Sequence, residues 1–376
     1  MTTRIVIDTD LGSDDYLAML FLLTRNDIII EAITIVHGLC DVEKSSKQLL
    51  SLLAYLGHKN ITVYCGETKS LFNNRTFPIE WKNAVNLVFD GIKHDLTNID
   101  NCSTLTAVEF LTERIQDPNK GPFKLLALGP LTNIALALRR VNTSSSISTP
   151  LALQEVIIMG GAINIPGNLS ITHTADYNIY AEWNIYCDPE AAHEVLSYTS
   201  SSYSPSYPNR LIALKVTLIG LDATNKVRIT TLDVDKFNLL STQTQTQAQS
   251  NHSYSSSSIY TSKIRNFISA ILEYNKEYIS NNTFYAWDPL IAVYIVYPDV
   301  VQLREGWIQV CVAEPEIGRT RLIGWSGDDN TKTSTTTYNG VDYDKTNDTK
   351  LYVNSVYIAI DAYPHIFHEA FFTAFT

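Results

Sequence analysis

The sequence Ile5-Val6-Ile7-Asp8-Thr9-Asp10-Leu11-Gly12-Ser13-Asp14-Asp15 sets the pattern for the whole chain. Its β-branched start predicts a buried strand, and the apolar run after Asp15 predicts a helix. Four carboxylates lie between them, and such a turn repels itself unless it holds positive charge. Carboxylates suit a hard divalent cation such as Ca²⁺ or Mg²⁺, and we expect Gly12 to let the chain bend back around it.

The alternation of short strand-like runs and longer helix-like stretches continues through the first two thirds of the chain. Strands separated by helices cross over in the right-handed sense onto a parallel sheet. The sequence therefore predicts an α/β fold with an open, doubly wound, mostly parallel, Rossmann-like sheet whose functional loops follow the carboxyl ends of the strands. The expected strands are 4–7, 29–36, 61–64, 124–128, 155–159 and 211–216, and the expected helices are 15–24, 42–56, 105–116, 131–139 and 189–197.

We expect a single domain over residues 1–376, with extra strands and helices in the C-terminal part, after Trp307. Three Ser/Thr-rich segments carry too little apolar surface to offset the entropy of ordering them, and they predict surface loops: 142–149, 197–206 and 241–258. The third is expected to be a flexible insertion just before a helical stretch at 264–278.

Composition excludes several classes of protein. Hydrophobic residues make up 45% and charged residues 18% of the 376 residues, which is typical of a folded protein. A net charge of −11 and the lack of long Lys/Arg runs argue against nucleic acid as a partner, and no apolar run is long enough to cross a membrane. Five widely spaced cysteines without a C-x-x-C pair predict no disulfide framework and favour a reducing, cytoplasmic location.

Other interpretations of the acidic turn remain. Asp14 and Asp15 could only cap the following helix, while Asp8 and Asp10 stay solvated. An EF-hand is excluded, because Ser13 and Met19 stand where that loop needs Gly and Glu. The pair Asp8 and Asp10 also resembles haloacid-dehalogenase-type phosphatases, although Gly12 departs from their pattern. A Mg²⁺-dependent phosphohydrolase with Asp8 as nucleophile is therefore the alternative.

A more specific resemblance covers most of the chain. The segment DTDLGSDD after a first strand resembles the signature of the inosine-uridine nucleoside hydrolase family. Further segments resemble that family's motifs in the same order: LGPLTNIALAL (128–138), IIMGGA (157–162), AEWNIYCDPEAA (181–192), LDATNKV (221–227) and YAWDPLIAVY (285–294). The Ser-rich insertions and much of the C-terminal region fall outside the resemblance.

The resemblance implies a Ca²⁺ site. Asp10, Asp15 and Asp288 would supply carboxylates and Thr132 its backbone carbonyl, which leaves room for one water and two ribose hydroxyls. Asp10 would act as general base on that water. Asp8 is then the member of the turn expected to be purely structural, and the Thr132 hydroxyl could also cap its helix.

The resemblance also implies ribose contacts, namely Asp14, Asn168, Glu182, Asn184 and Met159. Glu182 and Asn184 lie at i and i+2, so in extended backbone they would project to one side. Without the family pattern, each Asn is more typical of a turn and Met159 of a core.

The base site departs from many relatives. Trp287 stands directly before Asp288, where nonspecific and pyrimidine-preferring relatives carry a His that protonates the leaving base. FPIEW at 77–81 supplies a second indole, Trp81, and this combination is similar to the purine-specific branch, in which two tryptophans sandwich the base; Tyr285 joins this group. Packing is the alternative for both indoles.

A second departure lies at His37-Gly38-Leu39-Cys40-Asp41, which lacks the Asn that many relatives have there. Asp41 could replace that Asn or serve as a helix N-cap, and His37 is expected to be a hydrogen bonder at a strand end.

We therefore expect a nucleoside N-ribohydrolase that uses Ca²⁺ to release the base, preferably a purine, from a ribonucleoside. The resemblance implies a homodimer or homotetramer. The rivals are the Asp8 phosphohydrolase and a Ca²⁺-dependent nucleoside or sugar sensor that has lost turnover.

Overall fold

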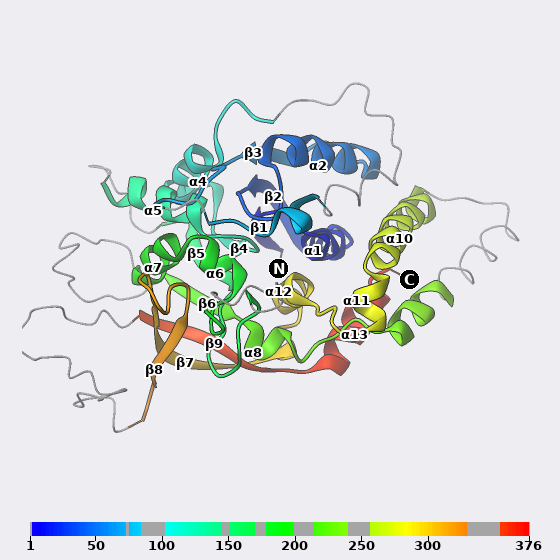
Figure 1. Ribbon diagram of the computed structural model, residues 1–376. Helices are drawn as coiled ribbons and strands as arrows, with labels where there is room; N and C mark the ends of the chain where they lie inside the picture. Colours follow the sequence, from blue (N-terminus) through cyan, green and yellow to red (C-terminus); the bar gives the residue numbers. More distant parts are fainter. Residues whose placement is uncertain are drawn as a thin grey trace, which may run out of the picture.

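The computed structural model describes residues 2–72, 75–83, 102–143, 151–169, 178–198, 214–239, 256–328 and 354–375. Within these residues nine strands form one sheet in the order β3-β2-β1-β4-β5-β6-β9-β7-β8 (Figure 1). The strands are β1 (Thr3–Thr9), β2 (Ile28–Ile35), β3 (Thr62–Cys65), β4 (Phe123–Ala127), β5 (Leu153–Met159), β6 (Lys215–Ile219), β7 (Val301–Val310), β8 (Thr320–Trp325) and β9 (Asn354–Ala362).

The pairs from β3 to β6 are all parallel, and β9 joins β6 in the same sense. β7 then pairs antiparallel with both β9 and β8, so the C-terminal strands extend a parallel sheet with an antiparallel edge. The predicted α/β architecture, doubly wound and mostly parallel with C-terminal additions, is confirmed.

Helices cover both faces of the sheet because its central strands are apolar on both sides. Ile5 and Ile7 of β1 pack into one core cluster, whereas Val6 between them packs into the other. The helices on the Ile5 side are α1 (Ser13–Leu23), α2 (Val42–Leu56), α8 (Leu221–Thr224), α10 (Ser256–Tyr274), α11 (Lys276–Ser280), α12 (Trp287–Val296) and α13 (Pro364–Thr373). On the Val6 side lie α4 (Ala107–Gln116), α5 (Thr132–Thr143) and α7 (Pro189–Ser197).

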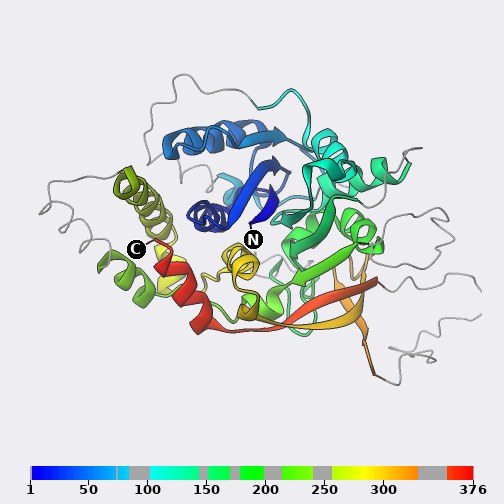
Figure 2. The same ribbon diagram turned by 180° about the vertical axis from the view of Figure 1, so that it is seen from behind.

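The C-terminal helix completes the first of these cores. Both views place α13 beside α12, and its phenylalanines pack into the same cluster as α1 (Figures 1 and 2). Phe371 stacks on Phe21 with ring centroids 5.7 Å apart. No described helix is both long and apolar enough to cross a membrane.

Most predicted elements are present within a few residues, and three boundaries differ more. α5 continues to Thr143, past the predicted end at 139, so the first two residues of the expected surface loop 142–149 are helical. β6 begins at Lys215 and continues to Ile219, where 211–216 was predicted; residues 211–213 lie outside the described residues. α10 begins at Ser256, so the last part of the segment 241–258 is helical, because the apolar stripe that follows continues the helix through the serines. The rest of that segment lies outside the described residues, as do most of 142–149 and 197–206.

Candidate active site

The acidic turn after β1 bends at Leu11 rather than at Gly12. Leu11 is buried in a left-handed conformation with φ 57°, and its amide donates to the Thr9 hydroxyl at 3.0 Å. Gly12 has an ordinary φ of −65° and is needed for another reason, because an added Cβ would lie 2.9 Å from carboxylate oxygens of Asp14 and Asp15. A strained non-glycine residue of this kind persists only where its surroundings hold it.

Three carboxylates meet where two helices begin. Oxygens of Asp14, Asp15 and Asp288 all lie within 4.8 Å of one another. Asp14 and Asp15 stand in the first turn of α1 and Asp288 in the first turn of α12, and these two helices pack against each other. The positive ends of both helix dipoles therefore offset part of the negative charge.

Most of that charge is not compensated by side chains. Burial raises the pKa of Asp288 well above its usual range, and the charges of Asp15 and Asp14 raise it further. Burial likewise raises the pKa of Asp14 to about 7. Across the described parts of the chain, no lysine or arginine forms an ion pair with this group, and the buried Oδ1 of Asp288 has no hydrogen-bond partner. An all-oxygen, uncompensated group fits a hard divalent cation.

Asp10 lies next to this group but not inside it. Its Oδ2 accepts a hydrogen bond from the Leu39 amide at 2.8 Å, and burial followed by the charge of Asp15 raises its pKa. Gly38 and Gly129 both pack closely against Asp10. An added Cβ at Gly38 would lie 2.0 Å from the Asp10 Oδ2, and one at Gly129 would lie 3.0 Å from the Asp10 Cβ. The structure thus places Asp14, expected among the ribose contacts, in the tight carboxylate group, and sets Asp10 beside it.

Asp8 has a structural environment. It is fully buried, and its Oδ1 accepts hydrogen bonds from the Thr34 hydroxyl and from the Asn133 amide, the latter at 2.8 Å. Asn133 also donates to the Ile35 carbonyl at 3.1 Å and accepts from the Glu67 amide at 2.9 Å. One side chain on α5 therefore joins the ends of β1 and β2 to the segment after β3.

Thr132 directly precedes Asn133 and makes a second set of bonds. Its hydroxyl donates to Asp188 at 2.6 Å and lies 2.8 Å from Nε2 of His37. A hydroxyl has one proton to give, so His37 must donate through Nε2. Burial lowers the pKa of His37 to about 4, which keeps the ring neutral. His37 is thus a hydrogen bonder at a strand end, as predicted, and the Thr132 hydroxyl does not cap its own helix.

The predicted ribose residues gather around the short helix α6 (Trp183–Cys187). Our prediction that Glu182 and Asn184 share an extended backbone is wrong for Asn184, which lies within α6. Glu182 is extended, with φ −102° and ψ 148°, and is the N-cap of that helix. Its carboxylate accepts from the amides of Asn184, Ile185 and Gly161 at 2.9 to 3.1 Å, so capping decided the local conformation.

Asn184 and Met159 nevertheless meet. The Asn184 amide nitrogen donates to the carbonyls of Leu128 at 2.8 Å and Met159 at 3.2 Å, beside the ends of β4 and β5. Asn168 lies at the start of α6, where its Oδ1 accepts from the Trp183 amide at 3.0 Å. The helix α6 therefore connects all the predicted ribose residues except Asp14.

The two predicted base-binding tryptophans belong to different aromatic groups. Trp81 packs against Phe77 and Trp183, with ring centroids 6.4 and 5.8 Å away. Trp287 packs against Tyr285 at 5.6 Å, and its indole N–H donates to Asn225 at 3.2 Å. Both indoles are thus partly used in packing, the alternative that we kept open.

Asp41, the possible replacement for the missing Asn, is exposed. Its carboxylate accepts from the Lys44 amide at 2.9 Å as the N-cap of α2. The N-cap interpretation is therefore the one that the structure favours.

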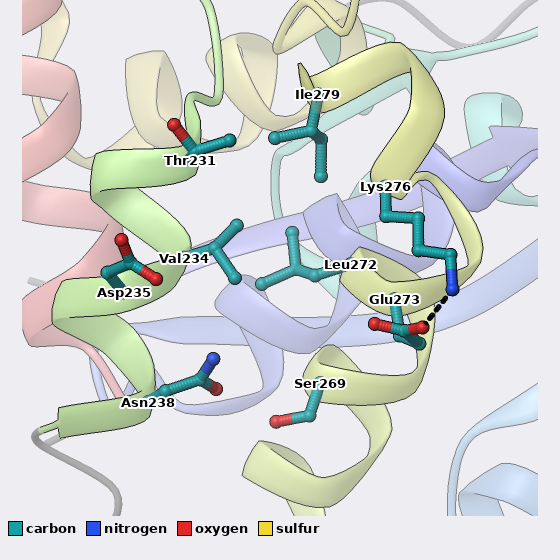
Figure 3. A pocket seen from close by; sticks show the side chains of 9 residues that line it. All are labelled: Thr231, Val234, Asp235, Asn238, Ser269, Leu272, Glu273, Lys276 and Ile279. Carbon is teal, nitrogen blue, oxygen red and sulfur yellow. Dashed lines mark hydrogen bonds and ion pairs between the residues drawn. The ribbon is translucent and has the colours of Figure 1, made fainter.

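A cavity of about 300 Å³ lies elsewhere, between the helical residues 231–239 and the helices α10 and α11 (Figure 3). Asp235, Lys276 and the Lys276 partner Glu273 are among the residues that line it. None of the predicted site residues does. The candidate active site therefore lies at the carboxyl ends of the strands and not in this cavity.

The family model of the inosine-uridine preferring nucleoside hydrolases matches residues 5–348. The chain belongs to this family. The pyrimidine-specific ribonucleoside hydrolase RihA of Escherichia coli O1:K1 is 25% identical over 318 residues, covering 82% of this chain and 85% of the relative. The family and the enzyme class that the motifs predicted are therefore confirmed for this nucleoside hydrolase.

Solved structures agree on the fold of this nucleoside hydrolase. A plant nucleoside hydrolase, PpNRh1, superposes with a TM-score of 0.70 at 20% identity, covering 100% of this chain and 99% of the other. A purine-preferring ribonucleoside hydrolase from Gardnerella vaginalis gives a TM-score of 0.67 at 21% identity, with 99% and 98% covered.

Two residues of this nucleoside hydrolase, Asn133 and Asp188, have a role that the sequence did not predict, although both lie within the segments that resemble the family's motifs. Asp188 precedes Pro189 at the start of α7, a signature of a helix N-cap, and it does accept from the Ala191 amide at 3.0 Å. Nothing in the sequence near Asn133 signals its contacts, because its partners lie on other strands.

We predict that Asn133→Ala lowers the free energy of unfolding by about 3 kcal/mol. It removes the side-chain partner of the Ile35 carbonyl and of the Glu67 amide, at roughly 1–3 kcal/mol for each group left unsatisfied, whereas Asp8 keeps its bond from Thr34. Urea unfolding measures the change. The exposed Asn119→Ala is the matched control and should change stability little. Equal, small effects in both variants would contradict the role given to Asn133.

Proposed function

We propose that this nucleoside hydrolase uses Ca²⁺ to hydrolyse the N-glycosidic bond of ribonucleosides, with a preference for purines. The observation that carries the proposal is the pair Trp287-Asp288, which puts an indole beside the buried carboxylates at the position where other members of the family carry a His that protonates the base. A homodimeric or homotetrameric state is proposed from the family resemblance alone. A cytoplasmic location is proposed because all five cysteines are free thiols.

The proposed cation ligands are Asp10, Asp15, Asp288 and the Thr132 carbonyl, as the resemblance implies. Asp14 belongs to the same tight carboxylate group as Asp15 and Asp288, so it joins the proposed site. The donor set favours Ca²⁺ over zinc because it is all oxygen, and bidentate carboxylates suit a large coordination sphere. When bound, the cation would make a nearby water more acidic and hold ribose hydroxyls. The unpartnered Oδ1 of Asp288 supports a ligand role for that side chain.

Asp10 is the proposed general base. The Leu39 amide and the close backbone of Gly38 and Gly129 hold its carboxylate in one orientation. Burial raises the pKa of Asp10, and a bound cation would oppose that shift and keep the carboxylate ionised, the form that can take up a proton. Asp10 accepts a proton from the water that attacks the anomeric carbon.

The sugar is held by side chains that are themselves fixed. The Asn184 amide nitrogen already donates to two backbone carbonyls, which fixes the orientation of the side chain. Its amide oxygen can then accept a hydrogen bond from a ribose hydroxyl. Three backbone amides lock the Glu182 carboxylate. Preorganised negative charge stabilises the positive charge that develops on the sugar as the glycosidic bond breaks.

The relatives differ in the base that they prefer, so the proposed base specificity rests on residues of this chain. The Escherichia coli relative is named pyrimidine-specific and the Gardnerella vaginalis structure purine-preferring. In this chain the Trp287 N–H is already donated to Asn225, and indole cannot act as a general acid. The leaving base must then carry its own protonation site, as the basic N7 of a purine does.

The two rivals are weaker. A phosphohydrolase needs an accessible Asp8, whereas Asp8 is fully buried. A sensor without turnover is disfavoured by membership of a hydrolase family.

We expect chelation to abolish both nucleoside hydrolysis and nucleoside binding, and elemental analysis of the untreated protein to find calcium. Added Ca²⁺ at about 100 times its Kd should stabilise the stripped protein by about 2.7 kcal/mol in thermal unfolding. Asp288→Asn should lose most of that gain. Bound zinc, or full activity after exhaustive metal removal, would contradict the proposal.

Asp10→Ala should lower inosine turnover at least about 100-fold, the lower range for losing a general base. Asp10→Asn is the matched variant, since it keeps the bond from Leu39 and should lose turnover equally. Asp8→Asn should instead lower thermal stability more than turnover. Turnover of p-nitrophenyl phosphate that depends on Asp8 would favour the phosphohydrolase.

The purine preference predicts faster hydrolysis of inosine than of uridine. Trp287→Ala should then slow inosine hydrolysis more than hydrolysis of p-nitrophenyl riboside, whose leaving group needs no proton. Stacking is worth about 0.5–1.5 kcal/mol per aromatic pair, so binding alone accounts for about tenfold at most. The distant Trp325→Ala serves as control. Equal losses on both substrates, or a preference for uridine, would show that the tryptophans only pack.

A further inference from the structure

Two cysteines that are distant in sequence meet beside the end of β3. Cys65 is the last residue of this strand, and its sulfur lies 2.7 Å from that of Cys102. The Ser103 amide donates to the Val63 carbonyl at 3.1 Å, so the returning chain is held along the strand. Both thiols are free and only partly buried. A disulfide requires about 2.05 Å between sulfurs, so a shift of less than about 1 Å would join them.

The pair is also chemically asymmetric. The Cys65 thiol donates its hydrogen to the Cys102 sulfur, and this bond lowers the pKa of Cys102 to about 6. The same bond raises the pKa of Cys65. Lys47 lowers the pKa of Cys102 further. Cys102 is therefore largely thiolate at neutral pH, which is the reactive form of a cysteine.

We propose that Cys65 and Cys102 form a thiol–disulfide exchange site that is oxidised by low-molecular-weight disulfides such as oxidised glutathione. The Cys102 thiolate attacks one sulfur of the small disulfide, whose S–S bond breaks and releases one thiolate that takes up a proton. Cys65 then loses its proton to solvent and attacks the Cys102 sulfur of the mixed disulfide, which releases the second small thiol. Two protein thiols are oxidised and one small disulfide is reduced to two thiols.

The bridge would tie together the two ends of a segment that includes Trp81. Cys65 is followed by Gly66 and Glu67, and Glu67 is bonded through its amide to Asn133 and through its carbonyl to the His37 amide at 2.8 Å. An added Cβ at Gly66 would lie 2.3 Å from the Asn133 amide oxygen, so this end of the segment is tightly packed. Oxidation therefore links the other end of the segment, Cys102, covalently to this tightly packed end. The inference does not depend on the substrate or metal proposed above.

The first test equilibrates the full-length protein with defined ratios of reduced and oxidised glutathione, blocks free thiols and maps disulfides by mass spectrometry. A Cys65–Cys102 bridge should form in the wild type and in Cys311→Ser, the matched control for a partly buried single thiol. Cys65→Ser should stop at a glutathione adduct on Cys102. Bridges that involve the other cysteines, or both thiols remaining free in oxidised glutathione, would overturn the proposal.

The second test measures the rate of Cys102 alkylation against pH. The midpoint should lie near pH 6 in the wild type. Cys65→Ser retains a hydrogen-bond donor and should keep a low midpoint, whereas Cys65→Ala should move it toward the ordinary value of about 8.5. An ordinary midpoint in the wild type would remove the chemical basis of the exchange, and an unchanged midpoint in Cys65→Ala would separate Cys65 from Cys102. Oxidised wild type should also unfold at a higher temperature than reduced protein, because the bridge constrains the unfolded chain.

Discussion

The hydrogen bonds of Thr132 and Asn133 hold the carboxyl ends of the parallel strands in register with one another. Asn133 joins β1, β2 and the chain after β3, while Thr132 joins His37 after β2 to Asp188 at the start of α7. Two consecutive residues of α5 thereby connect segments that are far apart in the sequence. Every candidate site residue follows one of these strand ends or lies on a helix packed beside them, so the geometry of the site depends on this junction.

Several carboxylates are buried close together near this junction, although burying their charge opposes folding. Burying several carboxylates together is unfavourable unless something positive or protonated accompanies them. The N-termini of α1 and α12 supply only partial charges. At the proposed cation site, the buried carboxylates would lower the stability of the empty protein and raise its affinity for a cation. The large apolar cores on both faces of the sheet provide stability that offsets this cost.

Much of this could be predicted from the sequence, because strand and helix periodicity and the motif order are local signals. Val42–Leu56 and Pro189–Ser197 have the predicted bounds, since capping Asp residues precede both helices. Features set by contacts between distant segments could not be predicted. Leu11 bends the turn instead of Gly12, Asp14 joins the tight carboxylate group, and Cys65 meets Cys102, all through packing that a single stretch of sequence does not encode.

The close approach of Gly38 to Asp10 has a consequence for how such chains can vary. Any side chain at position 38 would occupy the space of the Asp10 carboxylate, so that carboxylate would be lost or displaced first. Given the proposed role of Asp10, a mutational path that introduces a larger residue at 38 would pass through an inactive intermediate or change both positions together. In a library that randomises the loop after β2, this position should act as a bottleneck, while the exposed Asp41 three residues later tolerates exchange for other capping residues.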